Sequence, residues 1–314
     1  MRSSLLLLAP IAGLAAAFLA CTDSGYTPPL VTEKPDTGTD DAQVQPDSGT
    51  PDSAPPVDGG AQFVGVCSPT ANWIKPKLVD VNAQQDFGSI TPDETTIAWI
   101  EGNKLYWADR KTGGDPWGNA NKATVVGLAS TAVALSADGL RAIVVIDNGK
   151  NFGEIVRATK ADGFTADPDP TMFSSIGFAL SESPPGSKLD DPVLAKDGNH
   201  LYFTLYMPNS TTSMRASSRG ESTAKWTLGT PIVQPELALS GAQLRKPTGI
   251  STDRLTLFYW DQVDGAEHAA FRFTESDDFT IFVNLGTLSG GQVDATCNRL
   301  YYATPATFEY LTRQ

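Results

Sequence analysis

A short phrase recurs five times in this chain after residue 85. In each copy a polar turn containing an aspartate is followed, a few residues later, by a hydrophobic and aromatic segment. The turn aspartates are Asp93, Asp138, Asp197 and Asp253, and the fifth copy has Thr296 at this position. Successive copies begin 43 to 59 residues apart. A strand-rich unit of this length that repeats along a chain is typical of the blades of a β-propeller.

The copies predict most strands of such blades. Strand two is the segment after the turn, for example Leu201-Tyr202-Phe203 in the third copy. Candidates for strand three are residues 104–109, 154–157, 213–216, 269–273 and 308–311. Candidates for strand four are residues 123–127, 171–178, 226–233 and 280–285. The fifth copy has no room for a fourth strand, because the chain ends at Gln314.

A segment near residue 75 can supply the missing strand. The sequence from Trp73 to Val79 resembles the fourth-strand candidate that begins at Trp226. We therefore expect residues 72–80 to form the outer strand of the last blade, which leaves no open sheet edge between the chain ends. The predicted fold is all-β, a propeller of five blades with four antiparallel strands each. A six-bladed ring is the alternative, because two of the intervals between copies are long enough to hold further strands.

The repeat resembles a known family in the third copy, where Asp197-Gly198 precedes Leu201-Tyr202-Phe203. This pattern is similar to the TolB-type propeller repeat of bacterial envelope proteins, and the similarity extends over residues 70–314. The resemblance implies the fold and, by analogy, protein partners, but a shared fold does not transfer an activity. The turn aspartates are expected to be structural, because aspartate accepts backbone hydrogen bonds in tight turns.

The first twenty residues predict an export signal. Arg2 precedes an apolar run from Leu5 to Leu19, and small residues lead up to Cys21. Phe18-Leu19-Ala20-Cys21 resembles the lipobox of bacterial lipoproteins, although Phe18 and Leu19 depart from its usual residues. The resemblance implies cleavage before Cys21 and acylation of that cysteine. Ordinary secretion without a lipid is the alternative.

Residues 21–62 are predicted to be a disordered tether between this signal and a folded domain at residues 63–314. Residues 22–60 contain seven prolines, five glycines and eight acidic residues but one lysine, so they carry a net charge of −7. Such a composition buries too little apolar surface to offset the loss of chain entropy. We therefore expect a domain held away from a bacterial envelope membrane by a lipid-anchored tether. No cluster of lysine and arginine occurs, which argues against a nucleic-acid partner.

Cys67 and Cys297 remain as a pair if Cys21 carries a lipid. Outside the cytoplasm such a pair predicts a disulfide. Cys67 precedes the donated strand and Cys297 lies in the first hairpin of the last blade, so the bond would lock the ring closed. Two free thiols are the alternative.

The sequence offers little support for catalysis. It contains no Gly-x-Ser-x-Gly elbow, no His-Glu-x-x-His segment and no glycine-rich phosphate loop after a strand. No metal and no cofactor is therefore predicted. The enzymatic alternative is glycoside hydrolysis, which needs two carboxyl groups close together. Asp86 and Asp191 would be the pair, because both lie at the start of an inner strand, whereas Asp294 lies at the far end of its strand.

A binding role at one face of the ring fits the pattern better. The relevant face is formed by the starts of the inner strands and by the hairpins between strands two and three. The sequence places seven candidate ligand-binding residues there: Asp86, Phe87, Asp191, Tyr206, Lys246, Trp260 and Asp261. Aromatic rings beside carboxylates and a lysine suit a carbohydrate, a peptide or a protein. We expect a monomeric, non-catalytic interaction module whose partner is another envelope protein or a glycan.

Overall fold

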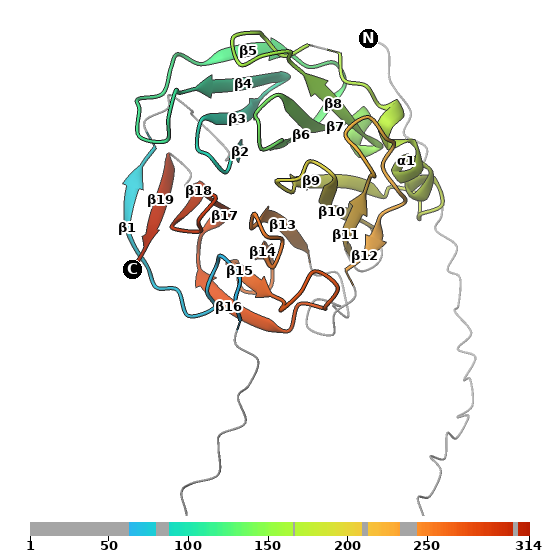
Figure 1. Ribbon diagram of the computed structural model, residues 1–314. Coiled ribbons are helices and arrows are strands. Elements are labelled where there is room, and N and C mark those ends of the chain that lie inside the picture. The colour runs from blue at the N-terminus through green and yellow to red at the C-terminus, as the bar shows by residue number, and fades with distance from the viewer. Residues whose placement is uncertain (1–62, 80–87, 166, 209–212, 233–243, 304–306) are drawn as a thin grey trace, which may run out of the picture. The chain divides into compact units, whose positions relative to one another are not determined.

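Figure 1 shows the computed structural model of the 314-residue chain. The structure describes residues 63–79, 88–165, 167–208, 213–232, 244–303 and 307–314. The compact unit that contains them runs from Gly59 to Gln314. The predicted signal peptide, Cys21 and the predicted tether lie outside the described residues. Within the described ranges, no helix is both long and apolar enough to cross a membrane.

Five antiparallel sheets surround a common centre, so the prediction of a five-bladed β-propeller is confirmed (Figure 1). The first two blades contain β2 (Ser89–Ile90), β3 (Thr96–Glu101), β4 (Lys104–Asp109) and β5 (Asn121–Thr124), then β6 (Leu128–Leu135), β7 (Arg141–Ile146) and β8 (Asn151–Val156). The next two contain β9 (Lys188–Leu194), β10 (His200–Tyr206), β11 (Ser213–Ser218) and β12 (Thr230–Pro231), then β13 (Arg245–Ile250), β14 (Thr256–Asp261), β15 (Ala266–Phe271) and β16 (Ile281–Gly286). The last contains β17 (Ser289–Val293), β18 (Arg299–Ala303), β19 (Phe308–Arg313) and β1 (Trp73–Leu78). A short 3₁₀ turn, η1 (Asp147–Gly149), joins β7 to β8.

The N-terminal strand closes the ring, as the sequence predicts. β1 pairs antiparallel with β19, and the register places Trp73 opposite Arg313 and Leu78 opposite Glu309. The buried disulfide between Cys67 and Cys297 adds a covalent link across this closure, with a Cα–Cα distance of 5.2 Å. The last blade therefore contains both ends of the propeller unit.

The recurring turns use their polar side chains locally. In the second copy the Ser136 hydroxyl donates a hydrogen bond of 2.5 Å to Asp138, and this carboxylate accepts the Leu140 N–H at 2.9 Å. The fifth copy keeps the same pair in reverse order, because the Thr296 hydroxyl donates to Asp294 at 2.6 Å. The hydroxyl and the carboxylate thus exchange places between the first and third positions of the turn, and the hydrogen bond between them is kept. These contacts support a structural role for the turn aspartates.

The residue one position further along has a positive φ in every blade. Glycine occupies this position in two blades, as Gly139 and Gly198. Glu94, Arg254 and Cys297 occupy it in the others, with φ values of 59°, 60° and 53°. This region of backbone conformation is unfavourable for side chains other than glycine, so these three residues must be held there by other contacts.

Each of the three non-glycine residues links its blade to another part of the ring. Glu94 accepts a hydrogen bond of 2.6 Å from Arg299 and another from the Tyr301 hydroxyl, both in the last blade. Arg254 donates to Asp197 of the preceding blade at 2.8 Å. Cys297 forms the disulfide. A glycine would relieve the backbone but would remove the link.

A second repeat stabilises four of the blades. An arginine follows the third strand and lies over an aromatic ring seven residues later, with the guanidinium carbon 4.1 to 4.8 Å from the ring centroid. The pairs are Arg110 with Trp117, Arg157 with Phe164, Arg219 with Trp226, and Arg272 with Phe279. The Nε of each arginine donates to the carbonyl of the residue with positive φ in the same blade. Each arginine therefore ties the outer part of its blade to the recurring turn.

The prediction of a fourth strand at residues 171–178 is wrong. The chain there forms η2 (Thr171–Phe173) and α1 (Ser174–Ser181), and the sheet of β6, β7 and β8 has three strands. Phe173, Ile176 and Leu180 recur at helical spacing and are buried in one core cluster with residues of the two adjacent blades. The helical period of these apolar residues explains why the segment does not extend the sheet.

Candidate ligand site at the channel mouth

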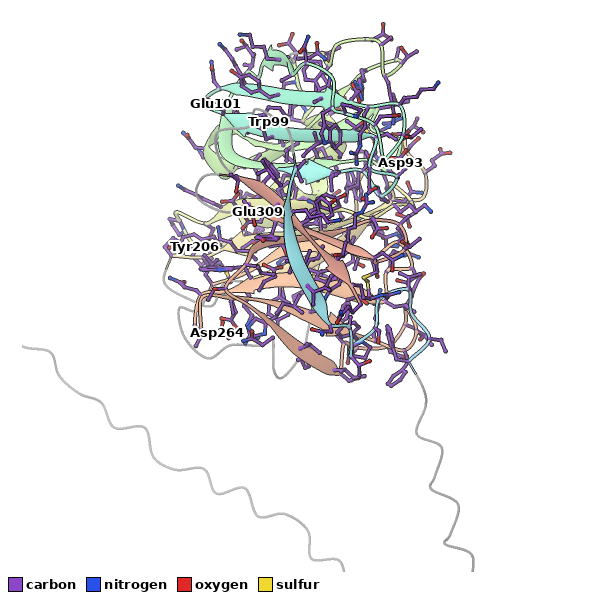
Figure 2. All side chains as sticks on the ribbon, turned by 90° about the vertical axis from the view of Figure 1, so that its left-hand side faces the viewer. Asp93, Trp99, Glu101, Tyr206, Asp264 and Glu309 are labelled. Atoms are coloured by element: carbon purple, nitrogen blue, oxygen red, sulfur yellow. A yellow bond between two sulfur atoms is a disulfide. The ribbon has the colours of Figure 1, made fainter. Side chains whose placement is uncertain are left out.

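A cavity of about 450 Å³ lies among the inner strands. Its lining includes residues at the starts of inner strands and residues at the ends of β14 and β18, next to the hairpins between the second and third strands. Figure 2 shows this face at one side of the ring, where Glu101, Tyr206 and Asp264 lie at such hairpins, with Asp93 at the opposite side. We call this cavity the channel mouth; its polar lining residues are Asp191, Lys246, Thr248, Gln262 and Gln292, with Trp260 as its aromatic residue.

The channel mouth coincides with irregularities in the inner strands. In β9, Asp191 and Pro192 lie opposite the single residue Phe203, and in β13 Thr248 has no opposite residue. The pairing of β17 with β18 shifts at Gly290 in the same way. A β-bulge of this kind bends a strand and changes the direction of its side chains. Asp191, Pro192, Thr248 and Gly290 all line the cavity.

Asp191 occupies the most strained of these positions. Its φ is 49°, and aspartate tolerates this left-handed region better than most residues but at some cost. The Asp190 carboxylate accepts the Asp191 N–H at 2.9 Å, which supports the bulge. Backbone strain of this kind is often found at functional sites. The strained position brings the Asp191 carboxyl group to the cavity wall.

Asp191 and Lys246 form an ion pair in the cavity, with 3.5 Å between Lys246 Nζ and Asp191 Oδ1. Burial, together with the charge of Asp190, raises the pKa of Asp191 to about 6, although Lys246 opposes the shift. Among the described residues, no hydrogen-bond partner reaches Asp191 Oδ2. The buried Thr204 hydroxyl lies close enough to lower the pKa of Asp191, but it makes no hydrogen bond of good geometry within the described part of the chain. The carboxylate is therefore only partly satisfied.

Trp260 completes one side of the channel mouth. It is directly opposite Lys246 in the pairing of β13 with β14, and both residues line the cavity. Side chains opposite each other on adjacent strands project from the same face of the sheet. The site thus combines a carboxylate, an ammonium group and an indole ring, drawn from β9, β13 and β14.

A second carboxyl group lies behind the cavity wall. Glu267 on β15 is completely buried, and its Oε1 accepts a hydrogen bond from the Thr248 hydroxyl. The Gly290 backbone also lies close enough to favour the ionised form of this carboxyl group. Glu267 Oε2 has no partner among the described residues. Burial raises the pKa of Glu267 to about 8. A side chain at Gly291 would place its Cβ 2.4 Å from Glu267 Oε1, so glycine is required for this close approach.

We expect Glu267→Gln to remove a pH dependence of stability. With a pKa of about 8 in the folded state and 4.5 as the ordinary value, folded Glu267 keeps a proton that the unfolded chain releases. The free energy of unfolding should therefore fall as pH rises from 4.5 to 8, by up to about 1.4 kcal/mol per pH unit. The neutral amide cannot titrate, so the free energy of unfolding of Glu267→Gln, relative to that of the wild type, should increase toward pH 8.

Urea unfolding at several pH values measures this difference. Glu182→Gln, at an exposed position after α1, is the matched control and should follow the wild type. Parallel pH profiles for the wild type and Glu267→Gln would show that Glu267 is already ionised in the folded protein.

The structure brings together three of the seven predicted face residues, namely Asp191, Lys246 and Trp260. Tyr206 is 41% exposed at the end of β10 on the same face, outside the cavity lining (Figure 2). Asp261 is buried and forms a 2.7 Å ion pair with Arg245, so its carboxylate stabilises the hairpin.

The other two predicted face residues, Asp86 and Phe87, lie outside the described residues. Thr248, Gln292 and Glu267 were not predicted from the sequence as site residues. Two features of the sequence could have indicated a buried acid at Glu267. One is a carboxylate within the mostly apolar segment Ala266–Phe271, and the other is the glycine pair at 290–291. Among the described residues, no group of three or more His, Cys, Asp or Glu side chains could hold a metal ion.

No protein-family model and no curated protein matches the chain. Solved structures with a similar fold include TolB from Acinetobacter baumannii, with 14% identity and a TM-score of 0.41 over 79% of this chain and 56% of that one. A putative TolB from Agrobacterium tumefaciens has 12% identity and a TM-score of 0.40, over 68% of this chain and 67% of that one. The β-propeller domain of Cps50 (Swd1) from Myceliophteria thermophila has 9% identity and a TM-score of 0.38, over 77% and 70%.

The chain thus spans just over half of the A. baumannii TolB chain that it matches. Similarities at this level do not assign an activity or a partner.

Proposed function

We propose that this protein is a non-catalytic binding module of the bacterial cell envelope, and that its propeller takes a ligand at the channel mouth. The carrying observation is the strained bulge at Asp191, which places a partly satisfied carboxylate in a cavity of about 450 Å³ beside Lys246 and Trp260. A concave site with few convergent polar groups and a perturbed pKa is the usual form of a ligand site. Its partner is an envelope protein or a glycan.

The proposed location is outside the cytoplasm. The buried Cys67–Cys297 disulfide supports it, because structural disulfides persist in oxidising compartments. In this proposal Cys21 carries a lipid, residues 21–62 act as the tether, and the propeller works as a monomer. Labelled palmitate should enter the wild type and should not enter Cys21→Ala; equal labelling of both would refute the anchor.

The observations favour binding over glycoside hydrolysis. Hydrolysis requires two carboxyl groups about 5 to 9.5 Å apart on either side of the scissile bond. Among the described lining residues, Asp191 is the one that carries a carboxylate, and Glu267 is buried behind the wall. The other candidate, Asp86, lies outside the described residues.

Capture of a partner from envelope extract tests the proposal. The wild type should retain its partner, and Lys246→Met should lose at least about tenfold in capture, because an interaction with a charged group is removed and Asp191 is left unpaired. Lys196→Met is the matched control, since Lys196 is exposed and does not line the channel mouth. It lies beside a smaller cavity of about 30 Å³, which adjoins the channel mouth at Val193 and Gln292. Equal capture by all three proteins, at equal thermal stability, would refute a ligand site at the channel mouth.

A further inference from the structure

We propose that the channel mouth binds a neutral sugar ring, such as the terminal hexose of a glycan. This inference rests on the proposed binding function and names the chemical class of the ligand. It follows from the size of the cavity, from the balance of charge within it, and from the unsatisfied state of its carboxylate.

The size of the cavity suits one sugar ring. Its volume of about 450 Å³ lies within the usual range for small-ligand sites. A hexose has about 12 non-hydrogen atoms, and even at the liquid volume of one water molecule per atom, about 30 Å³, it would need about 360 Å³. One ring therefore fits within the cavity.

The charge balance selects a neutral ligand. Asp191 and Lys246 are 3.5 Å apart, so a bound anion would be attracted by Lys246 and repelled by Asp191, and a cation would meet the opposite balance. A hydroxyl group can both donate and accept hydrogen bonds. Neighbouring sugar hydroxyls can donate to the Asp191 carboxylate and accept from the Lys246 ammonium group at the same time. Both charged groups of the ion pair can therefore form hydrogen bonds with a polyhydroxylated ligand.

The remaining lining groups fit the same chemistry. Asp191 has one long contact at Oδ1 and no hydrogen-bond partner at Oδ2 within the described residues, so added donors would satisfy a group that is otherwise left incomplete. Trp260 adds an indole, whose apolar face can pack against the C–H face of a sugar ring while its edge remains polar. Gln262 and Thr248 add amide and hydroxyl groups at the rim and wall.

A titration of the full chain with simple sugars tests the assignment. The probes are the methyl glycosides of glucose, galactose and mannose, with glucuronic acid and glucosamine as the matched anionic and cationic sugars. The chain has six tryptophans, so the indole ¹⁵N–H signal of Trp260 is first assigned with Trp260→Phe. At least one neutral glycoside should shift this signal saturably. Asp191→Asn should weaken binding at least about tenfold, and Lys196→Met should leave it unchanged.

Two results would overturn the saccharide assignment. One is a Trp260 signal that does not move with any neutral glycoside at tens of millimolar; the other is tighter binding of either charged sugar. If Lys246→Met still loses envelope capture in either case, the proposed function stands without the saccharide. If Lys246→Met captures like the wild type, the site itself is excluded and both proposals fall.

Discussion

Loss of the Cys67–Cys297 disulfide is expected to lower the free energy of unfolding by about 5 kcal/mol. The two cysteines are 230 residues apart, so the bond closes nearly the whole propeller into a loop and strongly restricts the unfolded chain. In the folded ring the same bond ties the segment before β1 to the first hairpin of the last blade. Denaturant unfolding of wild type and disulfide-free variants measures the difference.

The choice of substitution at Cys297 separates the bond from the backbone. Because Cys297 has a φ of 53°, Cys67→Ala/Cys297→Gly removes the bond and relieves the strained backbone, whereas Cys67→Ala/Cys297→Ala keeps the strain. The glycine variant should be the more stable of the two by about 1 kcal/mol. If wild type with reductant unfolds at the same denaturant concentration as without it, the bond does not stabilise the ring.

A chain that begins at residue 80 is expected not to fold. It lacks β1, so the edge of β19 and the apolar surface under Trp73 would be exposed in the last blade. The free energy of unfolding of a domain is typically about 5–15 kcal/mol. Loss of a complete strand together with the disulfide is expected to remove most of this stability. Circular dichroism and size-exclusion chromatography should show an aggregated or unfolded chain with no cooperative transition.

Two longer chains are the controls for this deletion. A chain that begins at residue 59 keeps the whole compact unit and should fold like the full protein. A chain that begins at residue 70 keeps β1 and loses Cys67, so it should fold with a stability close to that of the disulfide-free variants. A stable, monomeric propeller that begins at residue 80 would contradict closure by the N-terminal strand.

The second and third strands of the blades could be predicted because their signals are local. The segment 104–109 is β4 without any difference in bounds, and 308–311 falls within β19. Alternating burial and turn chemistry act over a few residues, so a repeat that preserves them is readable in the sequence alone. Segment 171–178 was mispredicted because its apolar residues have a helical spacing, which the expectation of a fourth strand ignored.

The sequence by itself determined the repeat, the ring, the pairing of β1 with the last blade and the cysteine pair, since each depends on patterns carried by neighbouring residues or by matching copies. The tertiary structure decided which of the predicted face residues meet in the channel mouth and what lies behind its wall. Asp191 and Lys246 meet because two inner strands leave regular register at bulges, and Glu267 can lie where it does because Gly291 of another blade allows its close approach. Register and burial depend on contacts between distant segments, which no local pattern encodes.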